Sequence, residues 1–523
     1  MNKSPFSVSI ENIKTLDDLE AVKIFKLLLN AEAVYYNFPL SQLQISENIK
    51  ASDEGIDAII RSNENKNFGD VLKEGNVIYQ IKADNSFANL ASMAIINELL
   101  VEKINKKDFE KLTDDSLKKL IKPKLLEHVA KGGYFILVSF RTDSVGDKKQ
   151  QTIDLIKNIF ERCGCKAPKI DIFDATNLQG FTNQHISVVN SIIPIPDVDS
   201  VDNMLKQENL NNTFYENDEI KEVAVQVKNF IENKDNCRHL RILAEPGIGK
   251  TKAILEFCKE YNSAVIYVEN ADKFDDSEFY SYLKKSSRQN FTLIIDECNS
   301  NNARTFWDKL KVRLPDLKLI TIYNELENYS YDAETKIIEY PRLHDEDFAE
   351  ILIQNYGVEK AAASHIASLC EGYPRLAHYI GKNYKNNRTL LDKLESVLNG
   401  VVLVGENNDS VKSNILCVLR FLSLFKKFGC SEIYQNEKNY IFNLIRSEIP
   451  DLTLIQFQDI VDNLKFKKIL QQEYTLYISP KILHIWFYKE FWRNQERKNL
   501  ILNDIDNMPE QLKTWFFEMF EYA

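Results

Sequence analysis

The sequence predicts a mixed α/β protein of several domains, and three features of the chain support that prediction. Its 523 residues are enough for three or four domains, because a domain commonly holds about 150 residues. Strand and helix patterns alternate between 240 and 323, which favours a parallel sheet covered by helices. From about Asp345 the pattern turns helical, and between 413 and 492 helices lead to a pair of strands, as in a winged helix.

The composition is that of an ordinary folded protein. Hydrophobic residues make up 44% of the chain and charged residues 27%, well outside the range of disordered sequences. No apolar run approaches the roughly 18 residues that cross a bilayer, and the first residues lack the apolar core of a signal peptide. We therefore expect a cytoplasmic protein without a membrane partner.

The net charge and the cysteine spacing argue against a protein that coats nucleic acid and against a common zinc site. A net charge of −11 argues against bulk attraction to nucleic acid, so DNA binding needs a local site. The eight cysteines are scattered, and the spacing of Cys163 and Cys165 matches no common zinc-ligand pair. We expect reduced thiols in the protein core.

Breaks in the patterns predict the domain boundaries. A first mixed unit contains helices at 16–36 and 152–162 and strands at 56–60, 77–83, 134–140 and 169–173. The segment from Pro194 to Asn203 carries two prolines and polar turn formers, which is typical of a linker. We divide the chain into a first domain at 1–193, a linker at 194–212, a sheet domain at 213–340, a helical domain at 341–400 and a winged-helix domain with a final helix at 401–523.

A glycine loop between a strand and a helix predicts a phosphate site. The strand at 241–244 leads into Glu245-Pro-Gly-Ile-Gly-Lys-Thr251, and the following helix has one apolar face. Backbone N–H groups of the loop can surround phosphate oxygens, the lysine supplies charge to the β and γ phosphates, and the threonine hydroxyl can bind Mg²⁺. Ala244 stands where the usual pattern has its first glycine. The predicted binding residues are Gly247, Ile248, Gly249, Lys250 and Thr251, with ATP or ADP and Mg²⁺ as cofactors.

Two carboxylates end the next apolar strand, Phe291 to Ile295, and complete this predicted site. Asp296 is expected to hold Mg²⁺ through water, and Glu297 to orient or deprotonate the attacking water. Asn324 follows another strand and could bond to the γ phosphate or to that water. The competing interpretations are a chance turn with Gly, Lys and Thr, acids that merely end a strand, and an asparagine that merely forms a turn.

The motif Glu371-Gly-Tyr-Pro374-Arg375, which follows helical residues, adds a family resemblance. The region 214–492 resembles STAND ATPases, in which a small helical lid with a Gly-x-Pro motif and a winged helix follow the nucleotide domain. The resemblance implies that Pro374 and Arg375 contact the nucleotide and that the lid and winged helix lock an inactive ADP state. Asn324 departs from the arginine often found there and is more similar to AAA+ sensors.

A second motif lies in the first domain. Gly55-Ile-Asp57 spans the start of one predicted strand, and Gln80-Ile81-Lys82 lies near the end of the next, where strand alternation places Gln80 and Lys82 on one face. This resembles PD-(D/E)xK nucleases, in particular the Mrr-like restriction group, and implies a restriction-endonuclease-like fold.

Phosphodiester cleavage explains this set of residues. Asp57 is expected to hold Mg²⁺, with Gln80 and the Ile81 carbonyl as further ligands. Lys82 would position and help deprotonate the attacking water. Glu32, on the helix at 16–36, is the predicted fourth member. An inactive domain of the same fold, or a chance match, is the alternative.

Together the two motifs resemble bacterial antiviral defence proteins in which an ATPase switch controls a nuclease. The resemblance implies a Mg²⁺-dependent DNA endonuclease, activated through homo-oligomers, with DNA as substrate and a partner protein or phage-derived molecule as trigger. The alternatives are a DNA-binding AAA+-type ATPase and a signalling scaffold, each with a catalytically silent first domain. The helix at 453–467 is not clearly basic at its start, which speaks against a DNA-reading winged helix.

Overall fold

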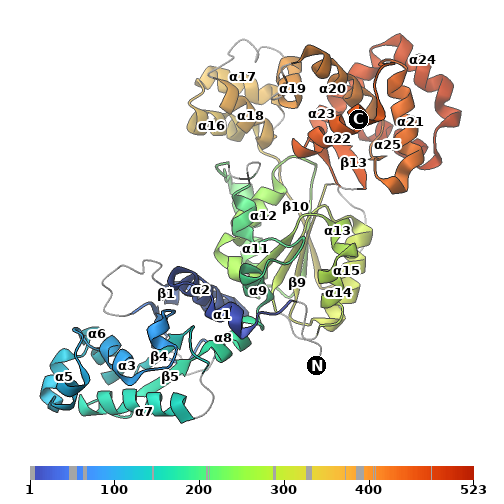
Figure 1. The fold of residues 1–523 in the computed structure, drawn as a ribbon. Helices are drawn as coiled ribbons and strands as arrows, with labels where there is room; N and C mark the ends of the chain where they lie inside the picture. The colour runs from blue at the N-terminus through green and yellow to red at the C-terminus, as the bar shows by residue number, and fades with distance from the viewer. Residues whose placement is uncertain are drawn as a thin grey trace.

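The computed structural model describes the whole chain except residues 1–5, 46–55, 63–67, 144–146, 208–209, 211, 287–289, 325–331, 371–372, 385–393, 404–405, 407 and 473. The predicted mixed α/β fold is confirmed: an N-terminal mixed domain, a central parallel-sheet domain and a helical C-terminal part follow one another (Figure 1). Among the described helices, none has the length and apolarity needed to span a membrane.

The N-terminal domain is built on a five-stranded sheet in the order β1-β2-β3-β4-β5. The first three strands are antiparallel neighbours, and β3, β4 and β5 run parallel. The long helix α2 covers one face and α3, α5, α6 and α7 the other. The strands are β1 (Leu43–Ile45), β2 (Ala58–Ile60), β3 (Val77–Lys82), β4 (Tyr134–Ser139) and β5 (Lys169–Phe173), and the helices include α1 (Ile10–Lys14), α2 (Asp18–Tyr35), α3 (Ser92–Leu99), α4 (Lys106–Glu110), α5 (Asp114–Leu120), α6 (Pro123–Ala130), α7 (Asp147–Arg162), α8 (Ala175–Thr182) and α9 (Ile186–Ile192).

The side chains of β3 alternate between two separate cores. Val77, Tyr79 and Ile81 pack toward α2, whereas Ile78 packs toward α3 and its neighbouring helices. Because strand side chains alternate, Gln80 and Lys82 share the face of Ile78. The predicted placement of these two polar residues on one face therefore agrees with the packing.

The N-terminal and central domains pack against each other through an apolar interface. Phe6 lies edge-on to Phe279 with ring centroids 5.8 Å apart, and one continuous core runs between the two domains. The segment expected as a linker lies against the central sheet: Asp199 and Tyr267 exchange two backbone hydrogen bonds of 2.8 and 2.9 Å, and α10 (Val201–Leu205) follows. Buried Ile195 and Val198 explain this packing, since their burial gains hydrophobic free energy.

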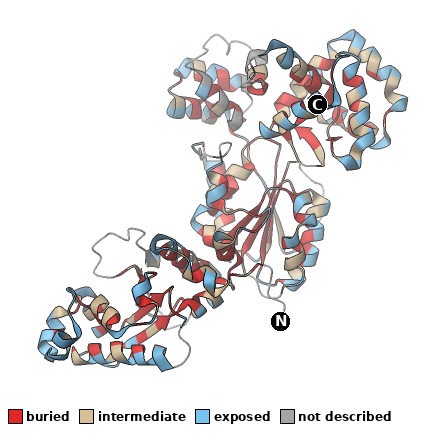
Figure 2. Cartoon of the chain, viewed as in Figure 1, coloured by how far each residue is buried: buried red, intermediate tan, exposed pale blue. Residues whose placement is uncertain are grey.

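The central domain has a five-stranded sheet, all parallel, in the order β10-β6-β9-β8-β7. Its strands are buried between two layers of helices (Figure 2). The strands are β6 (His239–Leu243), β7 (Val265–Val268), β8 (Thr292–Ile295), β9 (Lys318–Tyr323) and β10 (Thr335–Glu339); α11 (Asp218–Ile231) and α12 (Lys250–Cys258) lie on one face, and α13 (Ala271–Asp276), α14 (Glu278–Leu283) and α15 (Ser300–Arg313) on the other.

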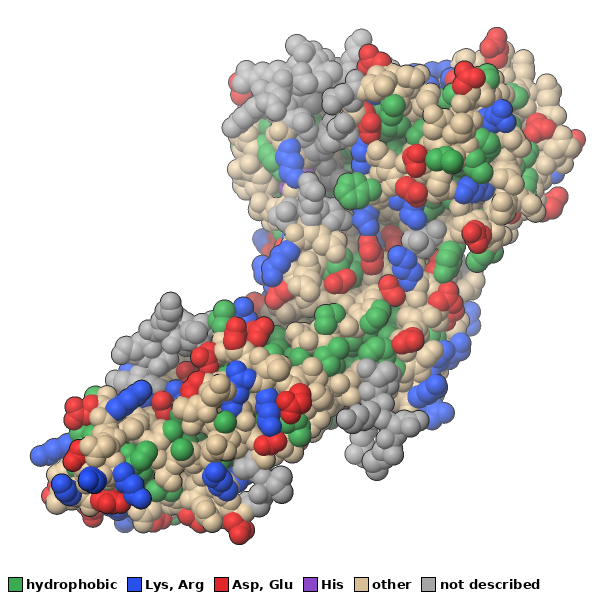
Figure 3. Space-filling model, in the orientation of Figure 1, with side chains coloured by type: hydrophobic (Ala, Val, Ile, Leu, Met, Phe, Trp, Pro, Cys, Tyr) green, Lys and Arg blue, Asp and Glu red, His purple; other side chains and the backbone are tan. Residues whose placement is uncertain are grey.

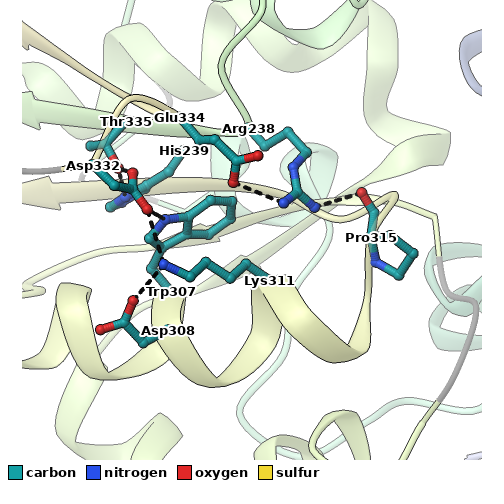
Figure 4. Close-up of polar contacts among 9 residues, drawn as sticks. All are labelled: Arg238, His239, Trp307, Asp308, Lys311, Pro315, Asp332, Glu334 and Thr335. Atoms are coloured by element: carbon teal, nitrogen blue, oxygen red, sulfur yellow. Dashed lines mark hydrogen bonds and ion pairs between the residues drawn. The ribbon is translucent and has the colours of Figure 1, made fainter.

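A polar cluster fixes the start of β10 to α15 (Figure 4). Trp307 Nε1 donates to Asp332 Oδ2 at 2.8 Å, and Lys311 Nζ lies 3.0 Å from the same oxygen. The Thr335 hydroxyl donates to the other oxygen at 2.8 Å. Although partial burial opposes it, hydrogen bonding from Lys311, Thr335 and Trp307 lowers the pKa of Asp332 to about 2.

Replacing Asp332 with alanine is expected to lower the thermal unfolding midpoint by a few degrees. The buried indole N–H of Trp307 then loses its acceptor, which costs about 1–3 kcal/mol. Because the folded pKa is depressed, the aspartate stabilises above its unfolded pKa, about 3.9, and this stabilisation is lost as the pH falls toward 2. Differential scanning fluorimetry from pH 7 to pH 2.5 measures the difference, with Asp308→Ala as a control that keeps the Trp307 bond. A pH-independent difference would contradict this account.

The C-terminal part is mainly helical, and its two groups of elements are called the lid (345–402) and the winged-helix region (409–522) below. A three-stranded antiparallel sheet in the order β11-β13-β12 forms the wing. The lid contains α16 (Asp345–Tyr356), α17 (Lys360–Cys370), α18 (Pro374–Tyr384) and α19 (Leu394–Val402); the rest contains α20 (Asp409–Leu422), β11 (Phe428–Gly429), α21 (Gln435–Arg446), α22 (Leu454–Phe466), β12 (Leu470–Gln471), β13 (Thr475–Ile478), α23 (Lys481–Trp492), α24 (Gln495–Asp504) and α25 (Glu510–Tyr522).

Candidate functional sites

The glycine loop connects β6 to α12, as the sequence predicts. Gly247 and Gly249 have φ values of +87° and +99°, where a side chain would strain the backbone. A Cβ atom on Gly247 would also lie 2.6 Å from Pro480 Cβ. The loop thus turns tightly enough to direct backbone N–H groups and the start of α12 toward a bound phosphate.

Lys250 is buried at the start of α12, with an exposed fraction of 4%. Its Nζ donates to the carbonyls of Ala244 and Glu245 at 3.1 and 2.7 Å and to Asn324 Oδ1 at 2.9 Å. Burial lowers the pKa of this ammonium to about 8. Neutral oxygen atoms therefore hold the Lys250 ammonium beside the loop. A bound phosphate could replace them as its hydrogen-bond partner.

Thr251 and Asp296 place two hard oxygen atoms side by side. The Thr251 hydroxyl donates to Asp296 Oδ2 at 2.6 Å, and the Tyr267 hydroxyl donates to the same oxygen at 3.0 Å. Burial raises the pKa of Asp296. A hydroxyl and a carboxylate oxygen this close suit Mg²⁺, which binds oxygen ligands and keeps several waters.

Glu297 lies next to this pair in a left-handed backbone conformation, with φ +49°. Asn324 Nδ2 donates to Glu297 Oε2 at 2.7 Å, so Asn324 joins Lys250 to Glu297. Burial, followed by the charge of Asp296, raises the pKa of Glu297 to about 7. A carboxylate with that pKa is suited to accept a proton from water near neutral pH.

The winged helix reaches into the same site. The Tyr477 hydroxyl of β13 lies 2.9 and 3.0 Å from the two Glu297 oxygens, and Asn324 Nδ2 also donates to that hydroxyl. On the adjoining surface, Lys468 Nζ pairs with Glu269 at 2.5 Å and Lys481 Nζ with Glu245 at 3.3 Å. The wing therefore occupies a hydrogen-bonding position on Glu297.

The lid closes another side of the loop. A Cβ on Gly249 would lie 3.6 Å from Pro374 Cγ, and the Tyr373 hydroxyl lies 3.4 Å from Glu245 Oε2. A cleft of about 340 Å³ lies between the loop, the lid and the wing, and its lining includes Ile248, Tyr267 and Pro374. Figure 3 shows charged side chains of both signs around this junction. The side chain of Arg375 lies outside the described residues.

In the N-terminal domain, the start of β2 lies beside the end of the antiparallel strand β3. This pairing brings together Asp57, Gln80 and Ile81. The Asp57 backbone N–H donates to the Tyr79 carbonyl at 3.0 Å, and Asp57 Oδ2 accepts from the Ile81 N–H at 2.6 Å. Gln80 is fully buried, and its Oε1 has no hydrogen-bond partner among the described residues. Gly55, also quoted in the motif, lies outside the described residues.

Glu32 does not join this group, contrary to the sequence-based expectation. Its carboxylate accepts hydrogen bonds of 2.7–3.1 Å from the backbone N–H groups of Asp70, Val71 and Leu72. The Tyr79 hydroxyl donates to the Val71 carbonyl, which places these contacts on the α2 side of β3, opposite Gln80. Glu32 is 3% exposed and holds a loop.

Glu98 of α3 contacts Gln80 and Lys82 instead. Its Oε2 accepts from Gln80 Nε2 at 2.8 Å and lies 2.8 Å from Lys82 Nζ. No sequence signal pointed to Glu98 or Tyr477, because the packing of separate elements brings each of them to its site. Among the described residues, no group of three or more His, Cys, Asp or Glu is arranged to hold a metal. Each candidate cation site therefore relies partly on hydroxyl, amide or carbonyl oxygens.

The central domain has the architecture of a P-loop domain, with a parallel sheet, left-handed glycines in the loop, a buried lysine and the Thr251–Asp296 pair.

Comparison with solved structures finds matches of low sequence identity. A Walker-type ATPase of Pyrococcus abyssi shares 13% identity over 52% of this chain and 96% of that chain, with a TM-score of 0.29. The RuvB Holliday junction branch migration motor of Thermotoga maritima shares 14% over 52% and 95%, with a TM-score of 0.28. A STAND protein with a tetratricopeptide repeat sensor from Pyrococcus horikoshii shares 14% over 60% and 48%, with a TM-score of 0.30. The sequence matches no protein-family model and no curated protein. The candidate nucleotide site is therefore identified from the residues of this chain.

Proposed function

We propose that the chain is an antiphage defence effector in which an ATP-binding switch controls a Mg²⁺-dependent DNA endonuclease. The observation that carries the switch is the contact of Tyr477 with Glu297, which ties the wing to the proposed catalytic base. The nuclease is supported by the grouping of Asp57, Gln80 and Ile81 at one end of two paired strands, with Lys82 on the same face as Gln80.

In the proposed ATPase reaction, Lys250 and the loop N–H groups bind the β and γ phosphates. Thr251 and Asp296 would hold Mg²⁺, which when bound neutralises phosphate charge. Glu297 orients the attacking water and accepts its proton, and Asn324 can bond to that water or to the γ phosphate. Pro374 and Arg375 of the lid are proposed to report which nucleotide is present.

In the proposed nuclease reaction, Asp57, Gln80 and the Ile81 carbonyl would hold Mg²⁺, which when bound activates water and polarises the scissile phosphate. Lys82 positions the attacking water and helps to remove its proton. The unpartnered oxygen of buried Gln80 supports a cation here, because a buried oxygen without a partner costs free energy.

We propose that opening of the wing couples the two sites. A trigger, either a partner protein or a phage-derived molecule, would separate Tyr477 from Glu297, and ATP binding would then favour homo-oligomers. Nuclease domains brought together in an oligomer could cut both DNA strands.

Replacing Tyr477 with phenylalanine is expected to raise basal ATP turnover several-fold. The variant removes a hydroxyl that lies beside Glu297 and, at 2.6 Å, beside Gln471 Oε1. Because its one proton is shared between these acceptors, the loss is smaller than the about 1.5–3 kcal/mol of a full hydrogen bond to a charged group. Steady-state phosphate release measures the effect. Tyr474→Phe is the matched control, because the Tyr474 hydroxyl crosses the same interface to Asp276 at 2.9 Å without touching Glu297. Equal rates in both variants would refute the proposed lock.

The main alternative is a winged helix that reads DNA. The outward face of α22, the helix that would enter a groove, presents Ile455, Asp459, Asp462 and Phe466, which are all exposed. Two acids and two apolar side chains do not attract phosphates, so this face does not favour the alternative. A scaffold without catalysis is the second alternative. It predicts no cleavage of DNA under any condition.

A further inference from the structure

The proposed nuclease site lacks a second acid on its strands, because Gln80 is neutral. The single carboxylate of Asp57 carries a charge of −1 and so neutralises only half of the charge of a divalent cation. The structure brings a second carboxylate from another element. Helix α3 is fixed by buried Ile95, Ile96 and Leu99, and it carries Glu98 to the face of β3 on which Gln80 lies.

The contacts of Glu98 differ from those of a simple surface ion pair. Its side chain is 23% exposed, and one oxygen, Oε2, accepts from Gln80 Nε2 and approaches Lys82 Nζ, each at 2.8 Å. Lys122 Nζ lies 4.0 Å from the same oxygen. A simple ion pair between Glu98 and Lys82 does not explain why the amide of Gln80 is also buried beside Glu98. That amide is fully buried, and its oxygen has no partner among the described residues.

The amide of Gln80 offers a direct route to a cation site. A half-turn about its last torsion exchanges nitrogen and oxygen, so Oε1 would take the position that Nε2 now holds, 2.8 Å from Glu98 Oε2. Neighbouring oxygen ligands of octahedral Mg²⁺, each at about 2.1 Å, lie about 3 Å apart. After this half-turn the two oxygens would be spaced as adjacent ligands.

We propose that Glu98 is a further ligand for a divalent cation, Mg²⁺ or Mn²⁺, together with Asp57 and Gln80. This inference rests on the proposed nuclease function. Two carboxylates balance the charge of the cation, and carboxylate and amide oxygens are ligands that both ions accept. Binding of the cation frees Lys82 from its ion pair with Glu98, so that its ammonium can face the water and the phosphate.

Titration of Mn²⁺ into the full chain without nucleotide, followed by electron paramagnetic resonance, tests the ligand directly. All proteins carry Asp296→Asn, which removes the carboxylate of the other cation site. We expect one bound Mn²⁺ in this parent, loss of binding in Asp57→Asn, and at least about 10-fold weaker binding in Glu98→Gln. Glu102→Gln, an exposed acid just beyond α3, is the control and should bind as the parent does.

The outcomes separate the two claims. If Glu98→Gln binds as tightly as the parent while Asp57→Asn does not bind, Glu98 is no ligand and the nuclease site stands. If the parent itself binds no Mn²⁺, even with duplex DNA present, both claims fail. Glu98→Asp keeps a carboxylate on a shorter side chain; binding between that of the parent and that of Glu98→Gln supports the assignment even if the glutamine variant unfolds.

Discussion

Glu297→Gln is expected to lower the rate of ATP hydrolysis by about 100-fold or more while ATP still binds. Glutamine keeps the size and the hydrogen bond from Asn324 but cannot accept a proton from water, and general-base catalysis contributes about 10²- to 10⁴-fold. Phosphate release measures hydrolysis, and fluorescence of a labelled ATP analogue measures binding. Asp308→Asn, at an exposed acid on α15, is the control.

The pH profile gives an independent check on the same residue. Burial and the charge of Asp296 raise the pKa of Glu297 to about 7, and only the ionised form can accept a proton. Hydrolysis should therefore rise as the pH increases from 6 to 8 and level off above. A Glu297→Gln variant with near-normal turnover, or a flat profile in the parent chain, would show that another group takes the proton.

Asp57→Asn is expected to abolish Mg²⁺-dependent DNA cleavage, with a loss of about 100-fold or more. Asparagine keeps an oxygen that can accept the Ile81 N–H but removes the charge that holds the cation, and that cation contributes several kcal/mol. Gel analysis of nicked and linear plasmid measures the loss. Asp154→Asn, an exposed acid on α7 of the same domain, is the matched control.

A folding control makes this result informative. Both variants should unfold at temperatures close to that of the parent chain, because neither removes an apolar contact. Cleavage that persists in Asp57→Asn, or that continues when Mg²⁺ is replaced by a chelator, would assign the cutting to a contaminant or to a different site.

The sequence predicts which side chains meet beside the glycine loop, because these residues lie in three short segments. A glycine loop, the acids after β8 and Asn324 after β9 meet because the carboxyl ends of parallel strands share one edge of the sheet. Lys250, Glu297 and Asn324 accordingly form one hydrogen-bonded chain. Their assignment to roles in catalysis remains a prediction.

The sequence could not predict contacts that depend on how separate elements pack against one another. Tyr477 lies 180 residues after Glu297, and only the packing of the wing on the central domain brings them together. Glu98 reaches Gln80 because α3 folds back on the face of β3 shared by Gln80 and Lys82. Both Glu98 and Glu32 lie on helices, so helical position gave no reason to prefer Glu98. The hydrogen bonds distinguish them, because Glu32 accepts backbone N–H groups on the opposite face of β3.

The most direct test of the account is plasmid cleavage by the purified chain with Mg²⁺, with and without ATP, and with a phage lysate as trigger. Asp57→Ala and Lys250→Ala are assayed beside it. We predict cutting that needs ATP and is lost in both variants, since one removes the proposed cation site and the other the charge that binds the phosphates. A chain that binds ATP but never cuts DNA, with or without the lysate, would contradict the central claim.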